Sequence, residues 1–352
     1  MQLLYSLFLH SLVGEAAPCE ATRWNPGGGS MDSAAEAGRW CYDVPMFSSE
    51  DPSANSLNNG SDTAFLSKLA AGGIAGAVAA GGLYYASRVE SANVEVKEVS
   101  LVLPRLSPEF DGYRIAQISD IHMDGWMTFE RLCKLTKLAS EQRADLIAAT
   151  GDFVTAKVKY IERELTEALA LLEAPDGVAA VLGNHDYIAD GSLVRRVIKD
   201  AGLVELSNDF FTLERGEGVL HIAGIDNFYQ RRARLDLVLS RLPEEGAAVL
   251  LAHEPDFAEV SAPTGRFDLQ MSGHSHGGQM RLPIVGAMAR PRRGRIYPDG
   301  VYDVDGMIQY TNRGLGMLWP HLRINCRPEI TVLTLRTPAP NNEKAADEKA
   351  DG

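Results

Sequence analysis

The stretch YRIAQISDIH, residues 113–122, decides how this chain folds. Its first seven residues form a short, mostly apolar run that is typical of a buried strand. Asp120 and His122, whose side chains can bind metals, follow that run directly. Because residues two apart on an extended segment point to the same side, we expect Asp120 and His122 to face one cleft. The stretch therefore predicts a strand that delivers two metal-capable side chains at its carboxyl end.

Four further stretches repeat this arrangement along the chain. Apolar runs at 146–150, 178–182, 247–252 and 269–272 lead into GD, GNHD, HE and GHSH. The polar side chains that follow them are Asp152, Asn184, His185, Asp186, His253, His274 and His276. In an open α/β sheet the carboxyl ends of the strands line one crevice, so we expect all five loops to converge.

The remaining periodicity supports an α/β layered core. Further apolar runs predict strands at 220–225, 308–311 and 330–335. Amphipathic periods predict helices at 128–142, 161–173, 192–201 and 235–242. Strands that alternate with helices in this way indicate an α/β fold in layers.

Each motif taken singly has an ordinary structural interpretation. An Asp-x-His pair is common in solvated loops, and Gly-Asp after a strand is typical of a turn or a helix cap. Five such groups, all at strand ends, are poorly explained by chance. Mixed carboxylate and imidazole ligands suit Mn, Fe or Zn better than Ca or Mg. The pattern thus favours a transition-metal site.

The ordered set of motifs resembles the calcineurin-like metallophosphoesterases over roughly residues 113–335. The segments GGQ at 277–279, NRGLG at 312–316 and PEI at 328–330 look like the bacterial membrane-associated branch of that family. The resemblance implies a layered β-sandwich core flanked by helices, with a dinuclear metal site at the C-terminal ends of strands. It also implies an enzyme, a metal-dependent phosphoric ester hydrolase that acts on phosphate mono- or diesters or pyrophosphates by in-line attack of a metal-bridging hydroxide.

The same resemblance implies a cofactor of two divalent metal ions, Mn, Fe or Zn, and roles for individual residues. One metal would be held by Asp120, His122 and His276, the second by Asn184, His253 and His274, and both by the bridging Asp152. His185 would contact the phosphate and protonate the leaving oxygen, while Asp186 holds its ring in place. We also expect Arg313 to reach the substrate.

Two alternatives remain open beside this interpretation: a more specific enzymatic activity and a metal-binding protein without catalytic activity. The family branch includes enzymes that split the pyrophosphate of UDP-2,3-diacylglucosamine. A degenerate, non-catalytic metal-binding scaffold would have lost a ligand, yet all seven expected ligands are present.

Composition limits the partners. The 352 residues carry 34 basic and 47 acidic side chains, a formal net charge of −13, which argues against a general nucleic-acid binder. The expected partners are a phosphoester substrate, which could be lipid-linked, and a membrane. A basic run at Arg290, Arg292, Arg293 and Arg295 fits anionic lipid headgroups, a second phosphate or a solvated loop equally well.

The chain divides into four parts. We expect a disordered extension at 1–60, a hydrophobic anchor or export-signal-like segment at 64–88, the catalytic domain at 91–336 and a disordered acidic tail at 337–352. The hydrophobic segment lacks the arginine pair of a twin-arginine signal, which favours an uncleaved anchor. We therefore expect a membrane-associated protein with a single N-terminal anchor. Lys68 and Arg88 nearly balance, so the side of the membrane stays open.

Overall fold

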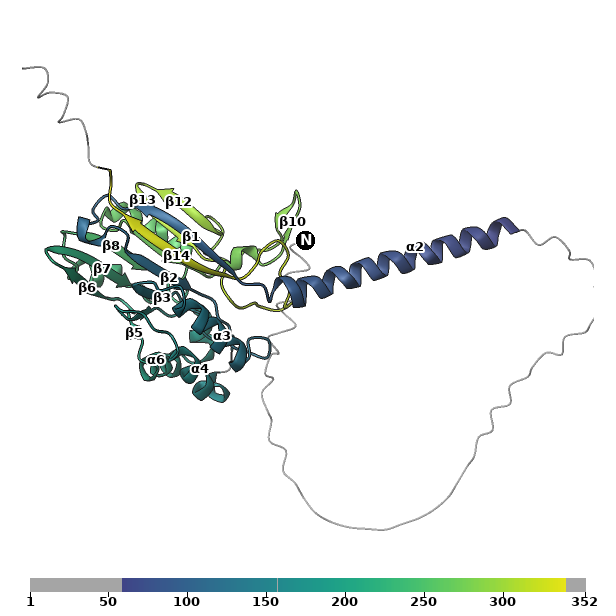
Figure 1. Ribbon diagram of the computed structural model, residues 1–352, viewed down its shortest axis with the longest axis horizontal. Coiled ribbons are helices and arrows are strands. Elements are labelled where there is room, and N and C mark those ends of the chain that lie inside the picture. The colour runs from purple at the N-terminus through teal and green to yellow at the C-terminus, as the bar shows by residue number, and fades with distance from the viewer. Residues whose placement is uncertain (1–58, 157, 340–352) are drawn as a thin grey trace, which may run out of the picture. The chain divides into compact units, whose positions relative to one another are not determined.

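The computed structural model describes residues 59–156 and 158–339 (Figure 1). The segments expected to be disordered, 1–60 and 337–352, lie outside the described residues apart from 59–60 and 337–339. The rest forms a two-sheet domain preceded by one long helix.

The first six-stranded sheet contains the strand that precedes Asp120 and His122. Its order is β1 (Glu95–Val102), β14 (Glu329–Arg336), β2 (Arg114–Ile118), β3 (Leu146–Ala149), β4 (Val178–Ala180) and β5 (Val204–Glu205). Strands β2 to β5 run parallel, and β14 is antiparallel to β2. The carboxyl ends of β2, β3 and β4 therefore meet at one edge of this sheet.

The second six-stranded sheet supplies the other expected motifs. Its order is β12 (Gly300–Val304), β13 (Met307–Thr311), β9 (Leu269–Ser272), β8 (Ala247–Leu251), β7 (Gly218–Gly224) and β6 (Asp209–Arg215). The four central strands are parallel, and the two outermost pairs are antiparallel.

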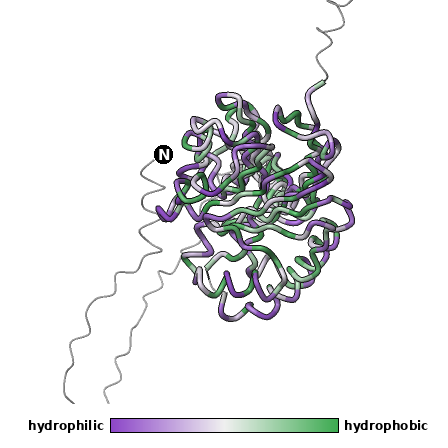
Figure 2. Tube along the Cα trace, turned by 90° about the vertical axis from the view of Figure 1, so that its left-hand side faces the viewer, coloured by the Kyte–Doolittle hydropathy of each residue, from purple (hydrophilic) through white to green (hydrophobic). Residues whose placement is uncertain are grey.

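Alternating side chains build three hydrophobic layers. Ile115 and Ala148 belong to a cluster that joins the two sheets, whereas the neighbouring Ala116 and Ile147 belong to a cluster shared with helices. The helices of that cluster are α3 (Phe129–Ser140), α4 (Glu162–Leu169) and α6 (Gly191–Asp200). A third cluster packs α7 (Leu235–Leu239) and α8 (Ala258–Ser261) on the second sheet. In Figure 2 hydrophobic colour gathers along the strands through the middle of the domain. The expected β-sandwich flanked by helices is confirmed.

All eight expected strands and all four expected helices are present, with ends shifted by a few residues. Several strands were not predicted, including the edge strands β1, β6 and β12. Their side chains are largely exposed or half-buried, and β1 buries only Leu101. Because one face of an edge strand is polar and the other only partly apolar, such strands lack the apolar run that marks a central strand.

The hydrophobic segment forms helix α2 (Asn59–Tyr84), followed by a π-helical turn, Tyr85–Glu90. Within it, residues 67–90 are long and apolar enough to cross a membrane. The side chains from Ser67 to Tyr85 are exposed, while Ala86 and Glu90 are buried. The carbonyl of Ala86 accepts a hydrogen bond from the Arg323 amide, and the Glu90 carboxylate accepts one from the Cys326 amide. The chain thus joins the domain at Ala86.

Candidate metal centre

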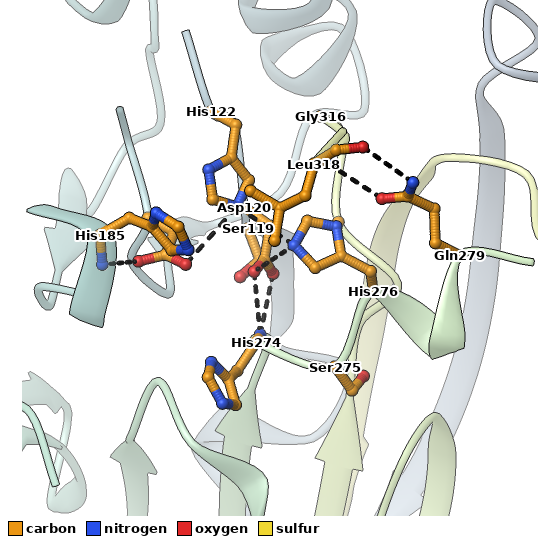
Figure 3. A network of polar contacts seen from close by, with 12 residues as sticks. Ser119, Asp120, His122, His185, His274, Ser275, His276, Gln279, Gly316 and Leu318 are labelled. Atoms are coloured by element: carbon orange, nitrogen blue, oxygen red, sulfur yellow. Dashed lines mark hydrogen bonds and ion pairs between the residues drawn. The ribbon is translucent and has the colours of Figure 1, made fainter. Parts of the chain in front are cut away.

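The seven candidate metal ligands converge where strands of both sheets end. Asp120 and His122 follow β2, Asp152 follows β3, Asn184 begins α5 (Asn184–Ala189) after β4, His253 follows β8, and His274 and His276 follow β9. All seven are buried. Figure 3 shows part of this cluster, with Asp120, His122 and His276 pointing toward one another.

Six of the seven form two compact triads. Asp120, His122 and His276 make one triad, and Asp152, His253 and His274 make the other; within each, the ligand atoms lie within 4.8 Å of one another. The Oδ2 atom of Asp152 lies 3.5 Å from His122 Nε2 and 3.2 Å from His253 Nε2. A single carboxylate oxygen therefore lies between the two triads.

The donor atoms fit two divalent metal ions. His122 Nε2 and His276 Nε2 face each other at 3.1 Å, and His253 Nε2 faces His274 Nδ1 at 3.2 Å. The amide oxygen of Asn184 is buried and has no hydrogen-bond partner in the described part of the chain. A buried polar atom without a partner is destabilising, and imidazole, carboxylate and amide groups are ligands for Mn, Fe and Zn.

The backbone brings these side chains together by turns. Five of the candidate ligands have positive φ angles: Asp120 (49°), His122 (48°), Asp152 (55°), His274 (66°) and His276 (50°). Asp120 and His122 do reach one site, as expected. The expected reason, an extended segment with both side chains on the same side, is wrong, because both residues have a left-handed backbone conformation. Non-glycine residues rarely adopt this conformation, and such residues gather at functional sites where the surrounding structure holds them.

Two glycines let the loops approach closely. A Cβ atom on Gly183 would overlap the Asp152 carboxylate, and one on Gly273 would overlap Ser119 and the Asp120 carboxylate. Glycine is thus required at positions 183 and 273, because neighbouring ligand side chains pack where a Cβ atom would lie.

Burial and charge separate the protonation states of the histidines. Burial lowers the pKa of His122 to about 3 and that of His274 to about 4, and it holds the pKa of His276 well below its usual range. Burial also acts to lower the pKa of His253, but the neighbouring carboxylate of Asp152 raises it well above its usual value. Three of the four imidazoles therefore favour the neutral form that binds metals.

His185 borders both triads without belonging to either. Its backbone N–H donates to Asp152 Oδ1 at 2.8 Å, and its ring Nδ1 lies 2.8 Å from the Thr155 carbonyl oxygen. The ring packs edge-on against the His122 ring, with centroids 4.9 Å apart. A carbonyl can only accept, so Nδ1 carries the proton in this contact and Nε2 is left for other partners.

Asp186 does not hold the His185 ring, contrary to the expectation. In the described part of the chain its carboxylate accepts four backbone hydrogen bonds, of 2.8–3.2 Å, from Asp152, Phe153, Val154 and Gly183. It therefore fixes the loop that carries Asp152 against the loop that carries Asn184 and His185. The expected role failed because the side chain points toward the loop of β3, which a local motif does not reveal.

Arg313 is turned toward two carboxylates instead of toward the triads. Its guanidinium pairs with Glu329 at 2.5 Å and with Glu95 at 2.7 Å. Glu329 is buried, with 1% of its side chain exposed. The positive charge of Arg313 is already compensated, so we no longer assign it to the substrate.

Two buried residues hold loops next to the candidate ligands, and the sequence did not predict these roles. Glu254, next to His253, is buried and accepts hydrogen bonds from the Asn227 side chain and from two backbone amides of the following residues. Arg323 is fully buried and donates to four carbonyls, among them those of Gly314 and Gly316, which pack against the Asp120 loop. Glu254 is the second residue of the HE motif, but the motif does not show which groups its carboxylate binds, and Arg323 belongs to no recognisable motif.

Comparison with known proteins agrees with this geometry. The family model of the calcineurin-like phosphoesterases matches residues 113–278. Metallophosphoesterase YkuE of Bacillus subtilis (strain 168) is 36% identical over 75% of this chain and 93% of its own length. Phosphodiesterase YaeI of Escherichia coli (strain K12) is 29% identical over 63% of this chain and 82% of its own length. UDP-2,3-diacylglucosamine pyrophosphatase LpxG of Chlamydia trachomatis (serovar D) is 26% identical over 71% of this chain and 91% of its own length. The expected family is confirmed: this chain belongs to the calcineurin-like metallophosphoesterases and is a metal-dependent phosphoric ester hydrolase.

Proposed function

We propose that this enzyme hydrolyses phosphodiester or pyrophosphate bonds of substrates at a membrane, with two divalent metal ions in the paired triads. The observation that carries the proposal is the position of Asp152 Oδ2, within 3.5 Å of a histidine from each triad. A carboxylate oxygen has lone pairs for more than one partner, so an oxygen in this position suits a ligand shared by two ions.

Seven side chains would hold the two ions. They are Asp120, His122 and His276 for the first, Asn184, His253 and His274 for the second, and Asp152 for both. When bound, two such ions lower the pKa of a water molecule, orient it for in-line attack and neutralise phosphoryl oxygens. Asn184 contributes a neutral amide oxygen, which leaves more positive charge to attract the substrate phosphate.

His185 would serve as the proton donor to the leaving oxygen. The Thr155 carbonyl holds one proton of the ring on Nδ1, so in the imidazolium form the second proton lies on Nε2 and is the one that can pass to the leaving oxygen, which leaves a neutral imidazole. The hydrogen bond from the His185 amide to Asp152 fixes this residue beside the second triad. Proton donation matters most for leaving groups that depart poorly as anions.

The membrane part of the proposal rests on the long hydrophobic helix. Residues 67–90 are long enough to span, and their exposed side chains leave the apolar surface available to lipid. A relative that is named for a lipid-precursor substrate, LpxG, supports the narrower candidate of a UDP-2,3-diacylglucosamine pyrophosphatase-type activity. The complete ligand set argues against a non-catalytic scaffold.

A substrate panel tests this function. Purified full-length protein is assayed with Mn, Fe or Zn, and with a chelator, on p-nitrophenyl phosphate, bis(p-nitrophenyl) phosphate, UDP-2,3-diacylglucosamine and phospholipids. We expect hydrolysis of diesters or pyrophosphates that chelation abolishes and added metal restores. Failure of the metal-loaded protein to hydrolyse any diester or pyrophosphate would overturn the proposal, and cleavage of monoesters alone would overturn its bond specificity.

A further inference from the structure

A short hairpin presents apolar side chains to solvent. It consists of β10 (Arg281–Leu282) and β11 (Gly286–Ala287) joined by three residues. Ile284 at its tip is fully exposed, and Val285 and Met288 are 71% and 51% exposed. Ile284 also has a φ of 69°, a conformation that a β-branched residue rarely adopts. Adjacent exposed apolar side chains of this kind mark an interaction site.

Arginines follow the hairpin directly. Arg290, Arg292 and Arg295 are exposed, and Arg293 stacks on the Phe228 ring at 3.7 Å. Among the described residues, none of these four arginines forms an ion pair with a carboxylate. In a chain with a formal net charge of −13, this concentration of unpaired positive charge is local and suits an anionic surface.

The hairpin shares one edge of the domain with the end of the hydrophobic helix. The amide of Arg281, at the hairpin base, donates to the Ile324 carbonyl at 2.8 Å. The adjacent amide of Arg323 donates to Ala86, two residues after α2 ends, at 3.1 Å. Figure 1 shows β10 and the C-terminal end of α2 at the same end of the domain. Tyr84, two residues before Ala86, and Trp319, four residues before Arg323, are exposed, and aromatic residues of this kind favour a membrane interface.

The arginine segment also touches the metal centre. The carbonyl of Arg292 lies 2.9 Å from His274 Nε2, and Gly294 lies against the His274 ring. The Asp256 carboxylate, three residues after His253, accepts the amides of Arg295 and Ile296. Any surface that binds the arginine segment 290–295 would therefore lie next to the candidate metal site.

The geometry points to a second membrane contact, in which the hairpin 281–288 enters the interface of an anionic phospholipid bilayer and the arginines at 290–295 bind headgroup phosphates. The orientation of this contact rests on the anchoring in the proposed function, since α2 delivers the same edge of the domain to the bilayer. With both contacts in place, the metal centre faces the membrane surface, where a substrate with an acyl chain is held.

A fluorescent reporter tests this contact in the full-length chain. Val285→Cys is labelled with the environment-sensitive dye NBD and compared with Val204→Cys, a matched valine that is 47% exposed on β5. The unsubstituted chain, labelled in the same way, gives the background from its own cysteines. Each protein is reconstituted in vesicles of phosphatidylcholine with or without phosphatidylglycerol. Flotation after alkaline extraction measures the anchor in the same samples.

We expect the emission at position 285, but not at 204, to rise and shift to the blue in the anionic vesicles. The triple variant Arg290→Gln, Arg292→Gln, Arg295→Gln should reduce that change. Water-like emission at 285 in anionic vesicles would overturn the hairpin contact, even where flotation shows that the helix is inserted. A response at 285 in protein that alkaline extraction removes would support the hairpin contact and contradict the anchor.

Discussion

The carboxylate of Asp152 performs two tasks at the scale of a single residue. Its Oδ2 lies between the triads, and its Oδ1 accepts the amide of His185, so one side chain relates the candidate ligands to the candidate proton donor. Although burial raises its pKa, the facing histidine His253 holds it well below the usual range, which keeps the carboxylate charged. The charge of this residue is therefore its essential property.

We predict that Asp152→Asn retains the fold but loses turnover and metal content. Asparagine has the same size, yet it brings no negative charge between two cations. Elemental analysis of the purified protein and an assay on bis(p-nitrophenyl) phosphate measure the two effects. Asp236→Asn, at an exposed position on α7, is the matched control and should behave as wild type. Two retained metals with a near-normal rate would exclude the bridging role.

His185→Ala should have a different effect. Because its ring packs against His122 but forms no hydrogen bond to any of the seven candidate ligands in the described part of the chain, we expect both metals to stay bound. Loss of a general acid lowers the rate by about 10²- to 10⁴-fold for poor leaving groups and much less for p-nitrophenolate. Ile188→Ala, an exposed position on the same helix, is the control. A His185→Ala protein that has lost metal would show instead that His185 is a ligand.

At the scale of elements, Arg313 links the end of β13 in the second sheet to two strands at the edge of the first sheet. It follows β13 and pairs with Glu95 on β1 and Glu329 on β14, and Tyr310 on β13 also donates to Glu329. These contacts link the two sheets close to the loop that packs against Asp120. The ion pairs of Arg313 thus stabilise the loop that packs against the candidate metal ligand Asp120.

Arg313→Ala should destabilise the fold instead of weakening substrate binding. It leaves the Glu329 carboxylate buried without its countercharge, a change that typically removes about 3–5 kcal/mol of unfolding free energy. Glu95→Gln removes only the more exposed partner and should change stability by less than about 1 kcal/mol. Urea unfolding measures both variants. A raised KM with an unchanged free energy of unfolding would instead indicate that Arg313 binds the substrate.

At the scale of the whole molecule, the long hydrophobic helix and the domain meet at a defined junction. Ala86, Glu90 and Ser91 are buried against the domain, and Ser91 accepts a hydrogen bond from Arg131. A truncated chain that begins at Tyr85 keeps all of these contacts, whereas one that begins at Ser91 loses the contacts of Ala86 and Glu90.

We predict that the full chain sediments with membranes and resists extraction by high salt. The chain that begins at Tyr85 should be released by high salt, since only the hairpin contact remains, and should still hydrolyse a water-soluble phosphoester. Sedimentation of both chains before and after the salt wash, with the assay on each fraction, measures this. Release of the full chain by salt alone would contradict the anchor.

The order of the motifs along the chain determines the family, the class of fold and the residues that gather in the centre. The apolar run at 113–119 followed by Asp120 and His122 is local information, because a buried central strand must be apolar and its end must leave the sheet. The four later motifs have the same local form. These features could therefore be predicted from the sequence by itself.

Only the tertiary structure decided how those residues are held. The positive φ angles at Asp120 and His122, the three amides of the β3 loop that donate to Asp186 and the pairing of Arg313 with Glu329 all depend on segments that are separated in sequence. Edge strands such as β1 lacked an apolar run, because one of their faces meets water. Local patterns record which side chains a strand buries, whereas the direction of a polar side chain depends on which partners the fold brings within hydrogen-bond distance.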